Sequence, residues 1–221
     1  MRKIKICGIT QEKELLWLFD NQVDYAGFVM FYPKSKRNQE EQSVKKLLET
    51  IDRHNVNNPD NQLHKAAVVV SPTKEQVITI QKLGFDLIQI HGELAEKAYA
   101  AAAIPILRAV NVSDGVNLKQ VEEMLTDAKI AGVVFDGKNP GEGKTFDWTM
   151  ISNLNRHGKL FVLAGGLNQE NVLEGIRRLS PDIIDVSSGV ENEDGTCKSE
   201  AKIAAFVRMV RLAEANQQKL L

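Results

Sequence analysis

The chain has little cysteine, no excess of positive charge and no long apolar run. Its 221 residues include two cysteines, Cys7 and Cys197, which form no CxxC pair and therefore predict neither a disulfide framework nor a zinc site. A formal net charge of -1 excludes the basic footprint that nucleic-acid binding requires. No apolar run approaches the roughly 18 residues of a membrane span. We therefore expect a cytoplasmic protein without nucleic-acid or membrane partners, and no protein partner is indicated.

What the chain does contain is an alternation of short β-branched runs with longer amphipathic segments. This alternation is typical of parallel strands joined by helical crossovers. The predicted strands are residues 3–7, 25–31, 65–70, 86–90, 105–110, 131–136, 160–163 and 182–186. The clearest predicted helices are residues 11–20, 40–53, 73–83, 118–128, 169–179 and 199–214, and a short one lies near 148–154.

This number of strand and helix units in one chain of this length predicts a single (β/α)8 TIM barrel that spans residues 1–221. An open doubly wound sheet gives the same alternation, but about five or six strands would be more usual for it. The polar stretch 52–64 is interpreted as a loop rather than a linker, because a break there would leave two half-cores. The tail 215–221 has little to bury and is predicted to fray.

A barrel places its active site at the carboxyl ends of its strands, where Cys7 and Asp136 lie in the sequence. Cys7 is either an inert buried thiol or a reactive one, and a reactive thiol would need a lowered pKa, with Lys5 and the loop 34–37 as sources of positive potential. Asp136 follows the apolar run 132–135. It either forms a loop hydrogen bond or acts as a general acid whose pKa is raised by its apolar surroundings.

Three further polar residues occupy strand ends or the loops beside them. Arg37 closes the loop 32–37, where its guanidinium group could pair with a substrate carboxylate. His91 has no histidine or cysteine at metal-ligand spacing, so we expect a structural or loop-orienting role and no metal. Asp185 could bond a sugar hydroxyl or a partner inside the barrel, and the pattern does not decide between these two roles.

Two glycine-containing loops predict a phosphate site and hence a small phosphorylated substrate. Gly165 and Gly166 follow the seventh strand, and Ser188 and Gly189 follow the eighth, where barrels often bind phosphate through backbone N–H groups. Taken singly, each stretch would be only a turn. The stretch 137–145 is similar to a nucleotide-binding P-loop, but its first glycine is one residue too far from Gly-Lys, so we interpret it as a mobile active-site loop.

Taken in order along the chain, several segments resemble the phosphoribosylanthranilate isomerase family of tryptophan biosynthesis. The resemblance is carried by residues 5–10, 27–29, 31–37, 89–92, 143–148, 163–167 and 185–191. It implies a cofactor-free Amadori rearrangement, with Asp136 as general acid, Cys7 as general base and Arg37 on the anthranilate carboxylate. The substrate phosphate would lie between Gly165 and Gly166 on one side and Ser188 and Gly189 on the other.

Two other functions fit part of the pattern. A dual-substrate isomerase that also serves histidine biosynthesis would need a second phosphate cradle, and no equivalent glycine-rich pair occurs in the first half of the chain. A non-catalytic barrel that only senses a phosphosugar would need neither Cys7 nor Asp136. The loop after Asp136 is short for the family, and a glycine stands there in place of the threonine that the resemblance implies.

Overall fold

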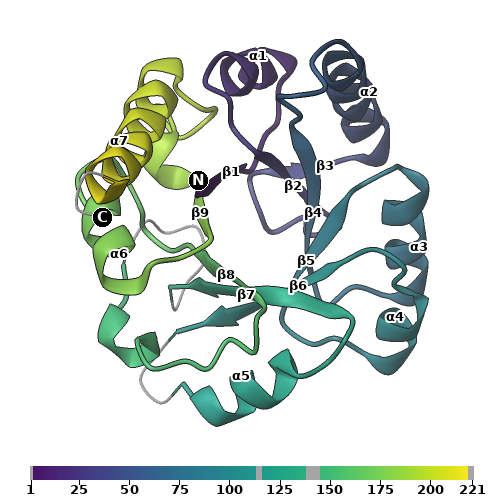
Figure 1. Cartoon of the computed structure of the whole chain (residues 1–221). Coiled ribbons are helices and arrows are strands. Elements are labelled where there is room, and N and C mark those ends of the chain that lie inside the picture. The colour runs from purple at the N-terminus through teal and green to yellow at the C-terminus, as the bar shows by residue number, and fades with distance from the viewer. Residues whose placement is uncertain (1, 113–115, 138–144, 219–221) are drawn as a thin grey trace.

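The strands of the chain close into a barrel, and the helices form a ring around it (Figure 1). A computed structural model describes residues 2–112, 116–137 and 145–218, with the backbone alone for 215–218. The strands are β1 (Lys3–Cys7), β2 (Tyr25–Met30), β3 (Asn38–Gln39), β4 (His64–Val70), β5 (Leu87–His91), β6 (Ile106–Asn111), β7 (Ile130–Asp136), β8 (Leu160–Leu163) and β9 (Ile183–Val186).

Closure of the barrel is visible in the pairing of its first strand. β1 pairs in parallel with β9, where Lys5 lies opposite Asp185, and also with β2, where Cys7 lies opposite Gly27. The remaining neighbours follow the order β9-β8-β7-β6-β5-β4-β2, so the predicted (β/α)8 barrel is confirmed. The sequence analysis missed β3. This strand pairs with the last residues of β2, beyond the residues that pair with β1, and it is too short to show a periodic pattern of apolar residues.

Each of the predicted barrel strands lies within one residue of its expected bounds at either end. The strands were recognisable because a parallel barrel buries both of their faces, so they read as nearly continuous apolar runs. In β7, for example, Val133, Val134 and Phe135 are all fully buried. Alternate side chains of each strand therefore point into the barrel, and the others pack against the helices.

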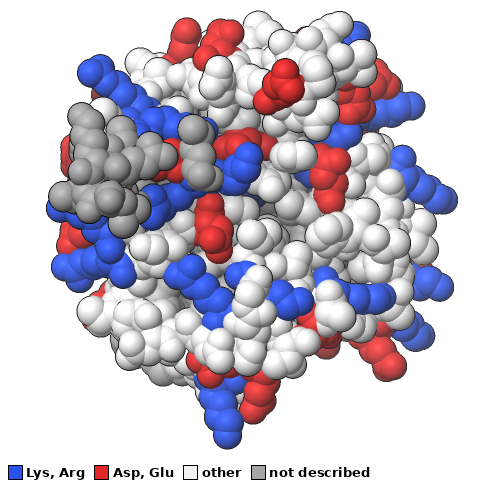
Figure 2. Space-filling view, viewed as in Figure 1, with Lys and Arg blue, Asp and Glu red and all other residues white. Residues whose placement is uncertain are grey.

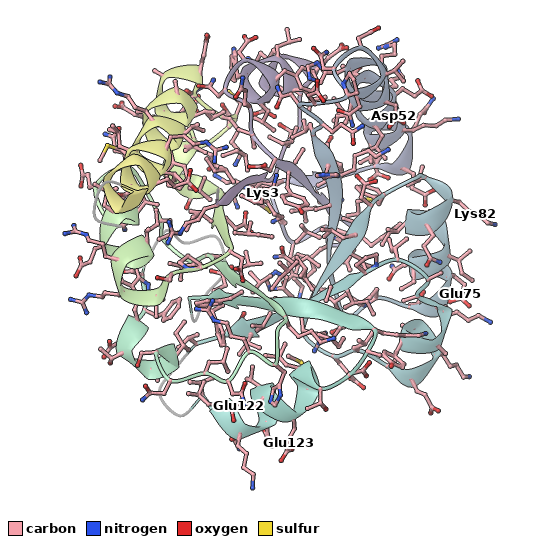
Figure 3. The ribbon with its side chains drawn as sticks, in the orientation of Figure 1. Lys3, Asp52, Glu75, Lys82, Glu122 and Glu123 are labelled. Atoms are coloured by element: carbon pink, nitrogen blue, oxygen red, sulfur yellow. The ribbon has the colours of Figure 1, made fainter. Side chains whose placement is uncertain are left out.

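The outer ring consists of helices that turn their charged faces to solvent. They are α1 (Glu12–Asp20), α2 (Glu41–Asn57), α3 (Lys74–Lys82), α4 (Glu96–Ala101), α5 (Leu118–Leu125), the 3-10 helix η1 (Trp148–Ile151), α6 (Val172–Leu179), the 3-10 helix η2 (Ser188–Val190) and α7 (Glu200–Gln218). Lys82 on α3 and Glu123 on α5 point outward (Figure 3). Charges of both signs are mixed on this face (Figure 2). Within the described ranges, no helix is long and apolar enough to cross a membrane.

Several predicted boundaries differ from the structure; the helix predicted for residues 118–128, for example, ends at Leu125. The stretch 52–64 is not all loop, because α2 continues to Asn57, where the His54 ring stacks on Phe19 at 3.7 Å and the Asn55 side chain bonds the backbone of Leu63. The helix predicted from residue 169 begins at Val172, since the Asn168 side chain accepts the N–H groups of residues 170 and 171. The backbone of α7 continues to residue 218, and residues 219–221 of the predicted frayed tail lie outside the described residues.

Candidate active site

A cavity of about 560 Å³ opens at the carboxyl ends of the barrel strands. Cys7 ends β1, His91 ends β5 and Asp136 ends β7, and all three side chains border this space. The rest of the wall comes largely from the loops after β2, β8 and β9, through residues 32, 34–37, 164–167 and 187–188. The structure therefore brings together the strand-end residues and the loops that the sequence analysis singled out.

Cys7 lies opposite Gly27 of β2, which has no side chain to fill the space. A Cβ atom at Gly27 would lie 3.1 Å from the Cys7 sulfur. Burial raises the pKa of the Cys7 thiol, and the charges of Lys5, Lys198 and Arg37 act in the opposite direction without outweighing it. The lowered pKa that a reactive thiol would need is therefore not found in the free site, although Lys5 and Arg37 act as the sequence analysis expected.

Beneath Cys7, the interior of the barrel holds a buried ion pair. The Nζ atom of Lys5 lies 2.6 Å from Oδ2 of Asp185, and both side chains are almost completely buried. Burial lowers the pKa of Lys5, but the Asp185 carboxylate and Cys7 outweigh it, so the pKa of the ammonium group is raised. Asp185 thus has a partner inside the barrel, as one of its two expected roles required. Asp185 also lines the cavity, and its Oδ1 atom is buried and has no hydrogen-bond partner among the described residues.

Asp136 is held at the end of β7 with its carboxyl group largely out of water. Burial raises its pKa to about 6, and the nearby charge of Asp185 adds to this effect. Two contributions oppose the increase: the Gly137 N–H group, which donates to Oδ1 at 2.7 Å, and the more distant Lys5. The loop hydrogen bond considered for Asp136 is present, and the raised pKa is the one that a general acid would need.

Arg37 reaches the cavity from the loop after β2. Its Nε atom donates to Oε1 of Glu191 at 2.5 Å, whereas its Nη2 atom is buried and has no hydrogen-bond partner among the described residues. The side chain crosses directly over Gly8, where a Cβ atom would collide with the arginine Cδ, and Gly8 has a φ of 82° that favours glycine. The arrangement leaves one end of a fixed guanidinium group free for an anionic ligand.

His91 is neutral at neutral pH. Burial lowers its pKa to about 4, and the charges of Lys5 and Arg108 contribute in the same direction. Its Nε2 atom lies 2.9 Å from the amide nitrogen of Gln89. In the part of the chain that the structure describes, no group of three or more His, Cys, Asp or Glu side chains is placed to hold a metal ion.

The two predicted phosphate loops lie side by side at the cavity. Gly165 and Gly166 have φ values of 82° and 64° and line the space together with Ser187 and Ser188. Gly189 is not among the lining residues. A Cβ atom there would collide with the Leu167 carbonyl oxygen, so this glycine allows the two loops to approach each other.

The loop after β8 also contacts the end of β7. A Cβ atom at Gly165 would lie 2.5 Å from the Gly137 nitrogen and 3.0 Å from Oδ1 of Asp136. Only a glycine lets the backbone of this loop rest against the carboxyl group. Residues 138–144, the larger part of the predicted mobile loop, lie outside the described residues.

Sequence reasoning missed Lys198 and gave no role to Glu191. Lys198 is almost fully buried, and its Nζ atom donates to Oε1 of Glu191 at 3.1 Å and to Ser187. Neither Glu191 nor Lys198 ends a barrel strand, and the turn between them shows no periodic pattern of apolar residues. In the structure, residue 191 pairs with residue 198 in a single antiparallel bridge that returns the chain to the barrel mouth, and no spacing rule marks this pairing in the sequence.

Comparison with known proteins gives one consistent result. The family model described as N-(5'phosphoribosyl)anthranilate (PRA) isomerase matches residues 4–209. An N-(5'-phosphoribosyl)anthranilate isomerase of Streptococcus mutans is 34% identical over 212 residues, which are 96% of this chain and 100% of that protein.

Solved structures agree in fold. The phosphoribosyl anthranilate isomerase of Thermotoga maritima has a TM-score of 0.78 and 31% identity, and covers 96% of this chain and 99% of its own. A phosphoribosyl anthranilate isomerase in complex with reduced 1-(o-carboxyphenylamino)-1-deoxyribulose 5-phosphate has a TM-score of 0.76 and 29% identity, with 96% of this chain and 99% of that chain covered.

Proposed function

The chain belongs to the N-(5'-phosphoribosyl)anthranilate isomerase family, and we propose that Cys7 and Asp136 are the base and the acid of its reaction. The reaction is the Amadori rearrangement of N-(5'-phosphoribosyl)anthranilate to 1-(2-carboxyphenylamino)-1-deoxyribulose 5-phosphate, in tryptophan biosynthesis. It is an internal redistribution of hydrogen within one phosphorylated sugar. Positioned acid and base groups therefore suffice, and the proposal includes no cofactor.

Asp136 acts first, as a general acid. In the proposal its carboxyl group protonates the ribose ring oxygen, and the ring opens to a Schiff base. A pKa of about 6 keeps roughly a tenth of the side chain protonated at pH 7, against roughly one part in 1,600 at the unperturbed value of 3.8. This raised pKa of a carboxyl group inside the cavity is the observation that carries the assignment.

Cys7 acts second, as a general base. Its thiolate takes the proton from C2' of the opened sugar, and the resulting enolamine tautomerises to the ketone product. The thiol's raised pKa makes the thiolate a minor species and correspondingly a stronger base. Lys5 and Lys198 support the thiolate through their positive charge. A free, functional thiol also fits a reducing compartment, so we place the protein in the cytoplasm.

The remaining cavity groups bind the two anionic ends of the substrate. Arg37 lines the cavity and has an unpaired Nη2 atom, and its guanidinium group binds the anthranilate carboxylate. The loops that contain Gly165, Gly166, Ser188 and Gly189 receive the phosphate, with Gly189 holding the two loops together rather than lining the cavity. Asp185 has one unpaired oxygen beside the cavity, which suits a sugar hydroxyl donor. His91, neutral and bonded to its own strand, orients the adjoining loop.

One assay tests the reaction and the roles together. Freshly generated N-(5'-phosphoribosyl)anthranilate is mixed with the protein, and the loss of its anthranilate-type fluorescence is followed. We expect Cys7→Ala and Asp136→Ala each to lower kcat by about 10² to 10⁴ with little change in KM. A folded wild-type protein without turnover would contradict the assignment, and a near-normal kcat for Cys7→Ala would make the thiol a packing residue.

A further inference from the structure

A cluster of charged side chains lies at the barrel mouth beside the proposed acid and base. The Glu191 cluster consists of Lys36, Arg37, Glu191 and Lys198. Its residues come from the loop after β2 and from the segment between β9 and α7. The reaction proposed above uses only Arg37 for binding, so the carboxylate at the centre of the cluster still needs a role.

Glu191 forms ion pairs with all three cations. Its Oε1 atom lies 2.5 Å from Nε of Arg37 and 3.1 Å from Nζ of Lys198, and its Oε2 atom lies 3.0 Å from Nζ of Lys36. Burial raises the pKa of Glu191, but the bond from Arg37, the charge of Lys198 and the bond from Lys36 outweigh it and lower the pKa to about 2. The carboxylate is therefore ionised at neutral pH.

The way in which Arg37 is held determines which of its donors remain free. Glu191 occupies the Nε edge of the guanidinium group, and Gly8 leaves the space through which the side chain passes. Nη2 then remains buried and unpaired among the described residues. An arginine on an unsupported loop would lose about 2 kcal/mol of side-chain entropy on binding a ligand, and a guanidinium group that is already fixed loses much less.

Lys198 in turn anchors Glu191. Its Nζ atom donates to the carbonyl oxygen and the hydroxyl group of Ser187 at 3.1 and 3.2 Å, and the Ser187 hydroxyl donates to the carbonyl oxygen of Cys7 at 2.9 Å. The Lys198 N–H group donates to Oε1 of buried Glu14 at 2.7 Å. Glu191 is therefore tied to the end of β1 and to the start of α1, and it cannot follow Arg37 if that loop moves.

The charges of the cluster do not cancel. Three cations surround one carboxylate, and this leaves two positive charges beside a cavity proposed to take a carboxylate and a phosphate. Without Glu191, three like charges would repel one another, and the guanidinium group would be driven toward solvent. The carboxylate therefore keeps the positive charge in place.

We propose that Glu191 is a positioning residue: it holds Arg37 by Nε so that the guanidinium group, with its unpaired Nη2 atom, stays at the cavity wall in the orientation that receives the substrate carboxylate. The inference rests on the proposed role of Arg37. Glu191 does not line the cavity, and its contribution to substrate binding is made through the orientation of the guanidinium group. Removing its charge therefore weakens substrate binding and leaves the chemical steps at Cys7 and Asp136 intact.

Steady-state kinetics with N-(5'-phosphoribosyl)anthranilate test this with Glu191→Gln, which keeps the shape and one acceptor oxygen but loses the charge. We expect KM to rise about tenfold or more and kcat to stay within about threefold of the wild type. The matched control is Glu193→Gln, the same change at an exposed neighbour, which should alter neither constant. An unchanged KM for Glu191→Gln overturns the inference.

A double-mutant cycle on kcat/KM separates positioning from a general loss of structure. In an Arg37→Ala background, Glu191→Gln should change kcat/KM by no more than about twofold, because its effect passes through the missing side chain. Additive effects overturn the inference.

If Glu191→Gln does not fold, Glu191→Asp replaces it in the same cycle, since it keeps the charge but cannot reach Arg37 from the same anchor. Wild-type protein without turnover contradicts the proposed function, and an unchanged KM for Arg37→Ala contradicts the role of Arg37 and with it this inference.

Discussion

Replacing Asp136 by asparagine should remove the proposed general acid and at the same time stabilise the fold. The carboxyl group has a pKa of about 6 in the folded protein against 3.8 without the fold. Above pH 6 the folded chain therefore carries a charge that its surroundings disfavour. Asparagine removes that charge and keeps the Oδ1 atom that accepts the Gly137 N–H group.

The magnitude follows from the pKa difference of about two units. At about 1.36 kcal/mol per unit, the gain in unfolding free energy is at most about 3 kcal/mol at pH 7.5. The pKa is raised in the folded state, so the wild-type disadvantage is absent below pH 3.8, develops between pH 3.8 and 6, and is complete above pH 6. At pH 5 the gain should accordingly shrink to about 1.6 kcal/mol.

Urea denaturation of wild type and Asp136→Asn at the two pH values measures this directly, with circular dichroism as the readout. Asp60→Asn serves as the control, because the same change at an exposed turn position should alter the unfolding free energy by less than about 0.5 kcal/mol at either pH. A variant that is no more stable than the wild type at pH 7.5 would refute the reasoning. If the gain in unfolding free energy is equal at both pH values, its cause is packing rather than charge.

Three further results are expected. In a Cys197→Ser background, the rate of Cys7 alkylation by iodoacetamide should still rise with pH beyond about 9, since the thiol's pKa is raised, and a plateau below pH 8 would contradict this. Gly165→Ala, at a φ of 82° and in close contact with the end of β7, should lower kcat/KM by about 10² or more, whereas wild-type kinetics would show that the loop has room. Lys5→Met should lower the unfolding free energy by about 3–5 kcal/mol by leaving the buried Asp185 carboxyl group without its partner, and Lys5→Met/Asp185→Asn should recover much of it in the same urea assay.

Local pattern was enough to place the barrel and to single out strand-end residues that line its cavity. Asp136 follows an apolar run, which is typical of a strand that is buried on both faces, whereas Cys7 ends a strand in which lysine and isoleucine alternate. Closure of the barrel then brings their strand ends together at one mouth without further information. The glycine loops at Gly165 and Gly189 were found in the same way, although only the structure shows that Gly189 contacts the neighbouring loop rather than the cavity.

What sequence could not supply were effects that depend on burial or on distant partners. The pKa of Cys7 is decided by desolvation, which Lys5 two positions earlier does not overcome, and the degree of burial is not written in the local sequence. Arg37 and Glu191 are separated by 154 residues, and no spacing rule connects them. The helix α2 extends past its predicted end because Asn55 finds partners at Leu63, a contact that exists only once the loop has formed.

The pairing of β1 with β9 sets the order in which the molecule can be completed. Lys5 and Asp185 are 180 residues apart, so during synthesis one edge of β1 stays without its neighbour until nearly the whole chain has emerged from the ribosome. An open edge of apolar, parallel strands is prone to pair with other chains. The ion pair that closes the barrel also closes that edge, and fragments lacking β9 should aggregate rather than retain partial activity. Acquisition of the fold and of the reacting site is thus one late event.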